Sequence, residues 1–138
     1  MKKSIKHLVL LGSTLAFLFT AMSMTQKAGE PWNIPAKYKT MKSTVKAGAP
    51  SITAEGKELF NKHCKACHGA KGLGDGPKAA SMKAGTGDFS SKAFQAQTDG
   101  EIYYQSFVGR GEMPNFEKKI TDDQDRWAVV GYIRTMKK

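Results

Sequence analysis

Two thiols and an imidazole stand close together near the middle of the chain, at Cys64, Cys67 and His68. This spacing places the two thiols about one helical turn apart, with the imidazole directly after the second. Each thiol can then add to one vinyl group of a haem to form a thioether, while the imidazole binds the iron. The spacing therefore predicts one covalent c-type haem, with Cys64 and Cys67 as thioether residues and His68 as an axial ligand.

Other uses of these side chains fit the sequence less well. A structural zinc site needs four Cys or His ligands, and beyond residue 23 the chain offers two cysteines and two histidines, His63 being adjacent to Cys64. A redox-active dithiol of the thioredoxin type is expected near a βαβ pattern, which this sequence lacks. A plain disulfide across two residues would be strained.

The iron needs a second axial ligand, and five residues carry a suitable donor. They are Met41, His63, Met82, Met113 and Met136. Met113 lies in a glycine-rich loop just before Pro114, and such a loop can bring a thioether to the far face of a flat cofactor. We therefore predict Met113 as the sixth ligand, although a lone methionine is more often core filler.

A ligating imidazole also needs a partner for its other ring nitrogen, which fixes its orientation and basicity. Pro77 closes the turn Gly74-Asp75-Gly76-Pro77, and we expect its carbonyl to accept a hydrogen bond from His68. The alternative is an ordinary turn proline.

Closure of both axial positions bears directly on function. A His/Met pair removes the open site that a haem enzyme needs, and a thioether ligand favours the ferrous state. We therefore expect electron transfer and no catalytic residues. A haem enzyme or gas sensor is the alternative, and it would require a displaceable sixth ligand.

The N-terminus has the pattern of an export signal. Three lysines precede an apolar run over residues 8–24, and Ala21 and Ser23 provide small residues at a cleavage site. The run is shorter than the roughly 20 residues that span a bilayer comfortably. We expect residues 1–23 to be a signal peptide, with an uncleaved membrane anchor as the alternative, and the remainder to be periplasmic.

The segments that must position the motif are predicted to be helices. Thr53 can cap a helix running into Cys64, and residues 69–97 have the composition of a long loop. Capping boxes at residues 98–101 and 121–124 precede two more helices, the first ending at Gly109. No β-alternation is convincing, so the predicted class is all-α.

The chain divides into three predicted parts. Residues 1–23 are the signal, 24–50 an extended basic linker or arm, and 51–138 the haem domain. The arm contains a series of apolar side chains that could pack as a belt across the domain: Trp32, Ile34, Tyr38, Met41 and Val45.

The sequence carries a formal net charge of +10. Such a field favours acidic partners and can speed their encounter, although a plain solubility charge is an equally simple explanation. The basic residues are spread along the chain without a recognition motif, so nucleic acid is not an expected partner.

Taken together, residues 52–138 resemble the class I cytochrome c family, especially its small monohaem domains. The resemblance rests on the cysteine motif and on four further stretches, namely residues 74–77, 98–101, 111–116 and 125–134. It implies a helical domain wrapped around one haem c, serving as a periplasmic carrier or as the haem subunit of a respiratory complex, with redox proteins as partners.

The resemblance also implies how the helices meet. Gly56 and Phe60 would contact the final helix around Gly131 and Tyr132, and it supports Pro77 as the carbonyl partner of His68. The chain departs from the family pattern at residues 83–89, which lack the usual prolines. The loop beside the haem propionates is therefore expected to differ in shape.

Overall fold

The computed structural model describes residues 31–46 and 48–138, so the predicted signal peptide lies outside the described residues. The described part is helical, which confirms the all-α class. Its elements are α1 (Ala36–Lys39), α2 (Pro50–His63), α3 (Lys65–His68), the 3-10 turn η1 (Ala79–Ser81), α4 (Lys92–Gln95), α5 (Asp99–Tyr103), the π-helical turn η2 (Tyr104–Val108) and α6 (Asp123–Arg134).

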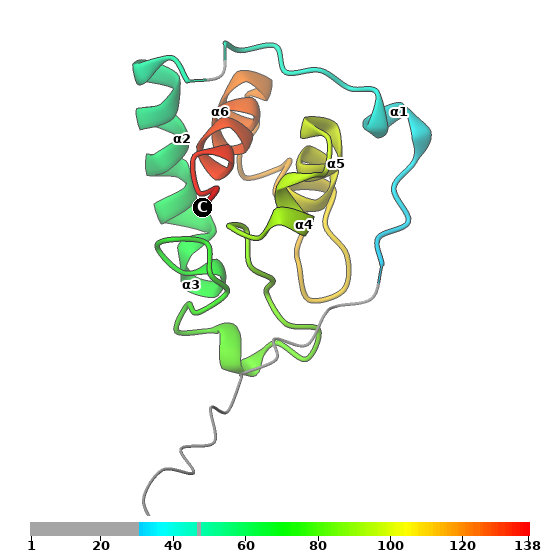
Figure 1. Ribbon diagram of the computed structural model, residues 1–138, viewed down its shortest axis with the longest axis vertical. Helices are drawn as coiled ribbons and strands as arrows, with labels where there is room; N and C mark the ends of the chain where they lie inside the picture. Colours follow the sequence, from blue (N-terminus) through cyan, green and yellow to red (C-terminus); the bar gives the residue numbers. More distant parts are fainter. Residues whose placement is uncertain (1–30, 47) are drawn as a thin grey trace, which may run out of the picture.

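Helices α2 and α6 lie side by side and make the most extensive helix pairing of the described chain (Figure 1). Phe60 of α2 packs edge-on against Tyr132 of α6, with ring centroids 5.4 Å apart. Phe60 is part of a fully buried core, in which the largest side chains are Trp127, Phe60, Phe107, Ile102, Ile133, Val129 and Val130.

The helices approach so closely because Gly56 has no side chain. A Cβ atom built there would stand 2.0 Å from the carbonyl oxygen of Ala128 and 3.0 Å from Cβ of Tyr132. Gly131, by contrast, has nothing within 4 Å of the position a Cβ would take. The contact surface of α6 is therefore made by Ala128 and Tyr132, and Gly131 does not take part in the close approach.

Two helix starts differ from the sequence-based expectation by a few residues. Helix α2 begins at Pro50, not after Thr53, because proline suits the first turn and Ala49 occupies the cap position. Helix α6 is capped by Asp122, whose carboxylate accepts hydrogen bonds from the N–H groups of Gln124 and Asp125. The expected box at residues 121–124 thus starts one residue too early.

The capping box ahead of α5 is confirmed. The Thr98 hydroxyl accepts from the Glu101 N–H, and the Glu101 carboxylate accepts from the Thr98 N–H. The helix continues as η2 and ends at Gly109, whose φ of 70° is one that side-chain-bearing residues rarely adopt. The position of this helix end determines where the following loop, which carries Met113, begins.

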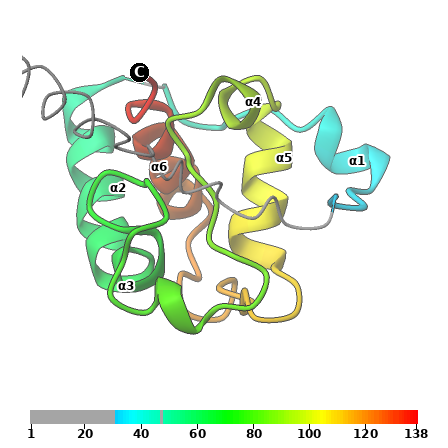
Figure 2. The ribbon, with the colours of Figure 1, turned by 60° about the horizontal axis from the view of Figure 1, so that its bottom comes forward.

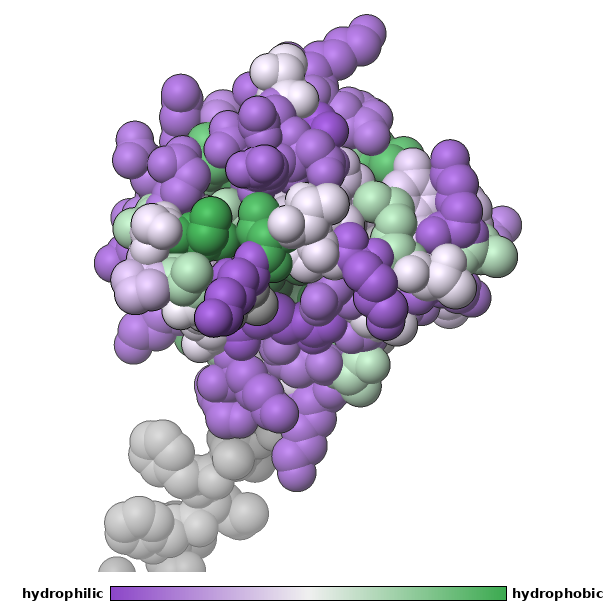
Figure 3. All heavy atoms as spheres, turned by 90° about the horizontal axis from the view of Figure 1, so that it is seen from above, coloured by the Kyte–Doolittle hydropathy of each residue, from purple (hydrophilic) through white to green (hydrophobic). Residues whose placement is uncertain are grey.

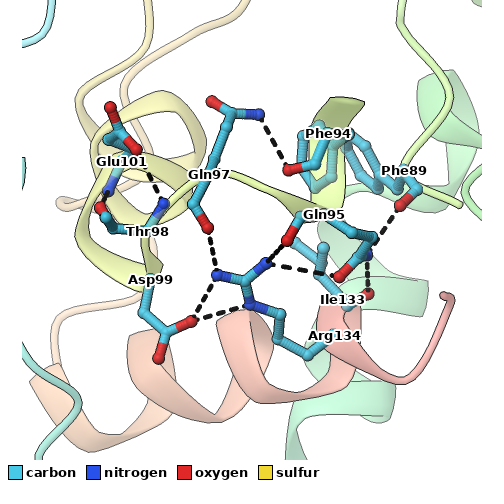
Figure 4. Close-up of polar contacts among 9 residues, drawn as sticks. All are labelled: Phe89, Phe94, Gln95, Gln97, Thr98, Asp99, Glu101, Ile133 and Arg134. Atoms are coloured by element: carbon cyan, nitrogen blue, oxygen red, sulfur yellow. Dashed lines mark hydrogen bonds and ion pairs between the residues drawn. The ribbon is translucent and has the colours of Figure 1, made fainter. Parts of the chain in front are cut away.

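A guanidinium ties the connection between α4 and α5 to the end of α6 (Figure 4). Arg134 forms an ion pair with Asp99 and donates to the backbone carbonyls of Gln95 and Gln97. The Gln95 amide in turn donates to the carbonyls of Phe89 and Ile133. These bonds hold residues 89–99 against α6.

The segment before α2 passes around the outside of α5 (Figure 1). Ile34 is buried, while Tyr38, Met41 and Val45 pack against the core. The Tyr38 carbonyl would stand 1.8 Å from a Cβ atom on Gly100. The apolar side chains of residues 31–46 therefore face the domain.

The face seen from above is covered mainly by hydrophilic side chains, as the composition leads one to expect (Figure 3). Within the described residues, no helix is long and apolar enough to span a membrane.

The crossing at Gly56 makes a testable prediction. We expect Gly56→Ala to lower the free energy of unfolding of the haem-loaded protein by about 2–4 kcal/mol, because the added methyl group meets backbone that must move. Gly131→Ala is the matched control, and it should raise that free energy by roughly 0.5–1 kcal/mol through helix propensity. Equal effects of the two substitutions in denaturant titrations would contradict the close approach of α2 and α6 at Gly56.

Candidate haem site

A cavity of about 920 Å³ lies beside the helix pair, near the upper end of the size range of ligand pockets. Four parts of the chain line it: α3, the segment from residue 78 to residue 97, the η2 turn with the loop that follows it, and residues Pro31 and Trp32 of the N-terminal segment. Its size and its largely aliphatic and aromatic walls suit a flat apolar cofactor.

The cysteine motif is shaped by the junction of α2 and α3. Cys64 is the cap residue between α2 and α3, and its carbonyl accepts hydrogen bonds from the N–H groups of Cys67 and His68 at 3.1 and 3.0 Å. Cys67 and His68 line the cavity, whereas Cys64 packs against the core. The short helix thus sets the Cys67 thiol and the His68 imidazole on the cavity wall.

The state of the two thiols bears on the alternatives. They are not joined in a disulfide. Burial, helped by the neighbouring Cys67, raises the pKa of Cys64 to about 12, whereas a redox-active dithiol needs a lowered thiol pKa. Among residues 31–46 and 48–138, no three His, Cys, Asp or Glu side chains gather as a metal-ion site. The geometry therefore favours neither a redox dithiol nor zinc.

His68 fits an iron ligand. Its ring is buried and stacks on Phe89, with centroids 4.4 Å apart and an interplanar angle of 25°. Its Nδ1 atom is buried without a hydrogen-bond partner. Burial lowers the pKa of His68, against a smaller opposing effect of the Thr86 backbone, so the ring is held in the neutral form that binds metals.

The segment containing Pro77 lies along α3. The Gly76 N–H donates to the Cys67 carbonyl at 3.2 Å, and the Lys78 N–H donates to the Ala66 carbonyl at 2.8 Å. A Cβ atom on Gly76 would stand 2.5 Å from the Ala66 oxygen, so the close approach needs glycine. Pro77 itself is exposed, and no hydrogen bond joins it to Nδ1 of His68. Its role as the partner of His68 stays a prediction.

Met113 lines the same cavity as His68. Its loop is tight, because the Met113 N–H donates to the Arg110 carbonyl at 2.9 Å and a Cβ atom on Gly109 would stand 2.4 Å from the Met113 oxygen. The fold thus brings the predicted fifth and sixth ligands, which are distant in sequence, to one space.

Of the other possible donors for the sixth position, one lines the cavity and three do not. Met82 also lines the cavity. Met41 and Met136 pack on the core, Met136 with its sulfur 2.5 Å from where a Cβ on Gly72 would stand. His63 lies edge-on to Phe116, with centroids 6.1 Å apart. Met82 therefore remains the competitor that experiment must separate from Met113.

Some cavity residues escape sequence reasoning. Phe89, which stacks on both His68 and Phe94, gives no signal beyond being aromatic in a long loop. Trp32 belongs to the predicted apolar belt, but nothing in the sequence places it at the cavity beside Arg110.

Comparisons with known proteins show what this chain is similar to. The family model for cytochrome c matches residues 53–137. One similar structure is a Kuenenia stuttgartiensis reducing HAO-like protein complex, with 25% identity and a TM-score of 0.55, covering 74% of this chain and 53% of that one. The chain therefore spans about half of that relative's length. A second is the c-type cytochrome KustC0563, with 32% identity and a TM-score of 0.53, covering 60% of this chain and 98% of that one. A comparison with curated proteins finds no match.

The cysteine geometry predicts how haem is retained. In Cys64→Ala/Cys67→Ala, we expect haem staining of the denatured chain to disappear, because no thiol remains to form a thioether. Each single variant should keep a stained band through the remaining thioether, and Lys65→Ala, between the two thiols, should stain like the wild type. A stained band in the double variant would contradict the assignment.

Proposed function

Since the chain belongs to the cytochrome c family, with one covalent haem c and haem-based electron transfer as its activity, we propose that His68 and Met113 are the axial iron ligands. Cys64 and Cys67 are the thioether residues in this proposal. The observation that carries it is the shared cavity, whose wall includes the buried imidazole of His68 and the half-buried thioether of Met113.

When bound, the haem supplies an iron that gains and loses one electron. The chain's residues set the conditions for that exchange. Phe89 and Phe94 form an aromatic stack behind His68, which restricts how the ring can turn and keeps water from it. The Met113 thioether favours the ferrous state and leaves no axial position for a substrate. These properties suit an electron carrier.

The domain organisation is part of the proposal. Residues 51–138 form the cytochrome domain, residues 24–50 the arm, and residues 1–23 the export signal that leads to the periplasm. A haem-stained protein in the periplasmic fraction, beginning after Ser23, would support this. A stained protein that keeps residues 1–23 in the membrane fraction would show an uncleaved anchor instead.

Two kinds of partnership are compatible with the comparisons. One relative is a reducing HAO-like protein complex, which supports a role as a haem subunit of a larger redox assembly. A diffusing carrier is the other kind. Docking through the apolar side of the arm is not favoured, because Ile34, Tyr38 and Met41 already pack on the domain. Pull-down from membranes followed by haem staining separates subunit from carrier.

The partner's docking surface is proposed to be acidic. Seven lysines that flank the haem motifs are all exposed: Lys62, Lys65, Lys71, Lys78, Lys83, Lys118 and Lys119. Electron-transfer rates with an acidic protein should fall as salt rises, because screening weakens attraction between exposed charges. Rates independent of salt would exclude this steering.

The ligand assignment has a direct spectroscopic test. Ferric wild-type protein should show the weak near-infrared band of a methionine–iron bond. We expect Met113→Ala to lose the band, because the thioether sulfur is gone, while the matched variant Met82→Ala keeps it. Loss of the band in Met82→Ala alone would transfer the role to Met82.

A further inference from the structure

The loop that carries Met113 is held from outside the cytochrome domain. Arg110, on this loop, donates a hydrogen bond of 2.7 Å from its Nη1 to the carbonyl of Pro31. Its guanidinium also lies over the Trp32 ring, 4.0 Å from the centroid. A charged donor and a cation–π contact therefore join the loop to the N-terminal end of the arm.

The arm is itself fixed to the domain. Trp32 meets Tyr104 edge-on at 6.3 Å, and Tyr38 packs against Tyr104 at 4.7 Å and stacks on Tyr103 at 6.5 Å. With Ile34 buried, these contacts bind residues 31–38 to α5 and η2. The end that reaches Arg110 is thus a fixed point on the domain.

The contact reaches the thioether through a short backbone path. Arg110 and Met113 form an isolated β-bridge, and the Met113 N–H donates to the Arg110 carbonyl at 2.9 Å. Because the loop is this tight, a displacement of Arg110 carries Met113 with it. Arg110 and Trp32 both line the cavity beside Met113.

A second contact holds the loop from the other side of the cavity. The Glu112 carboxylate accepts a hydrogen bond of 3.1 Å from the Ala84 N–H. Figure 2 shows the two segments concerned, the one after α3 and the one after α5, coming together at the lower edge of the molecule. The Met113 loop is therefore held between residue 84 and the arm.

We propose that residues 31–38 act as a strap that holds the Met113 loop over the haem, with Trp32 and Arg110 as positioning residues that determine how readily an external ligand displaces Met113. This rests on the proposed function, because it takes Met113 as the sixth ligand. The strap explains why an arm outside the family's domain carries a buried isoleucine and a tryptophan that reaches the cavity.

Imidazole binding to the ferric, haem-loaded protein tests the strap, since an imidazole nitrogen replaces the Met113 sulfur with no change of iron oxidation state. Trp32→Ala and Arg110→Ala should each bind imidazole roughly three- to tenfold more tightly, the range expected when one contact of this kind is lost. The near-infrared band should persist in both variants without imidazole. The double variant should bind no more tightly than about the Arg110→Ala variant, because Arg110→Ala already removes both the hydrogen bond to Pro31 and the contact with Trp32.

The control is Asp122→Ala, which removes the α6 cap and lowers global stability without touching the loop. It should bind imidazole like the wild type. A change of less than threefold in Trp32→Ala, or an equal change in Asp122→Ala, overturns the strap while the ligand assignment stands. A near-infrared band that survives Met113→Ala overturns both.

Discussion

The close crossing of α2 and α6 determines where every other part of the domain can lie. Because Gly56 has no side chain, the backbone of α2 lies directly against the Ala128 carbonyl and the Cβ of Tyr132 on α6. The cysteine motif follows α2 directly, so this crossing fixes the position of Cys67 and His68 relative to the core. Arg134, at the far end of α6, then ties down residues 95–99 and with them the start of α5. The positions of the segments that line the cavity therefore depend on this helix pair.

Much of the arrangement follows from local rules that a sequence displays. The capping box at Thr98, the helix end at Gly109 and the spacing of Cys64, Cys67 and His68 are each determined by residues close together in the chain. The expected start of α2 is wrong because Thr53 resembles a cap, whereas Pro50 suits the first turn better. Errors of this kind move a boundary and leave the site intact.

What sequence reasoning did not reach depends on contacts between distant segments. Nothing local indicates that Phe89 stacks on His68, or that Arg110 meets Pro31 and Trp32. Two further questions also depend on contacts between distant segments. One is whether the Pro77 carbonyl accepts from His68, and the other is whether Met113 or Met82 binds the iron. In the structure both methionines line the cavity, so the choice between them rests on the loop that holds Met113.

In the proposal, both faces of the haem iron are closed, by a nitrogen of His68 and the sulfur of Met113. X-ray absorption at the iron edge of the wild-type protein tests this most directly, because it reports the atoms bound to iron without any substitution. We expect one sulfur among the six atoms of the first coordination shell, in both the ferric and ferrous forms. A shell of nitrogen and oxygen only, or one with five atoms, would contradict it.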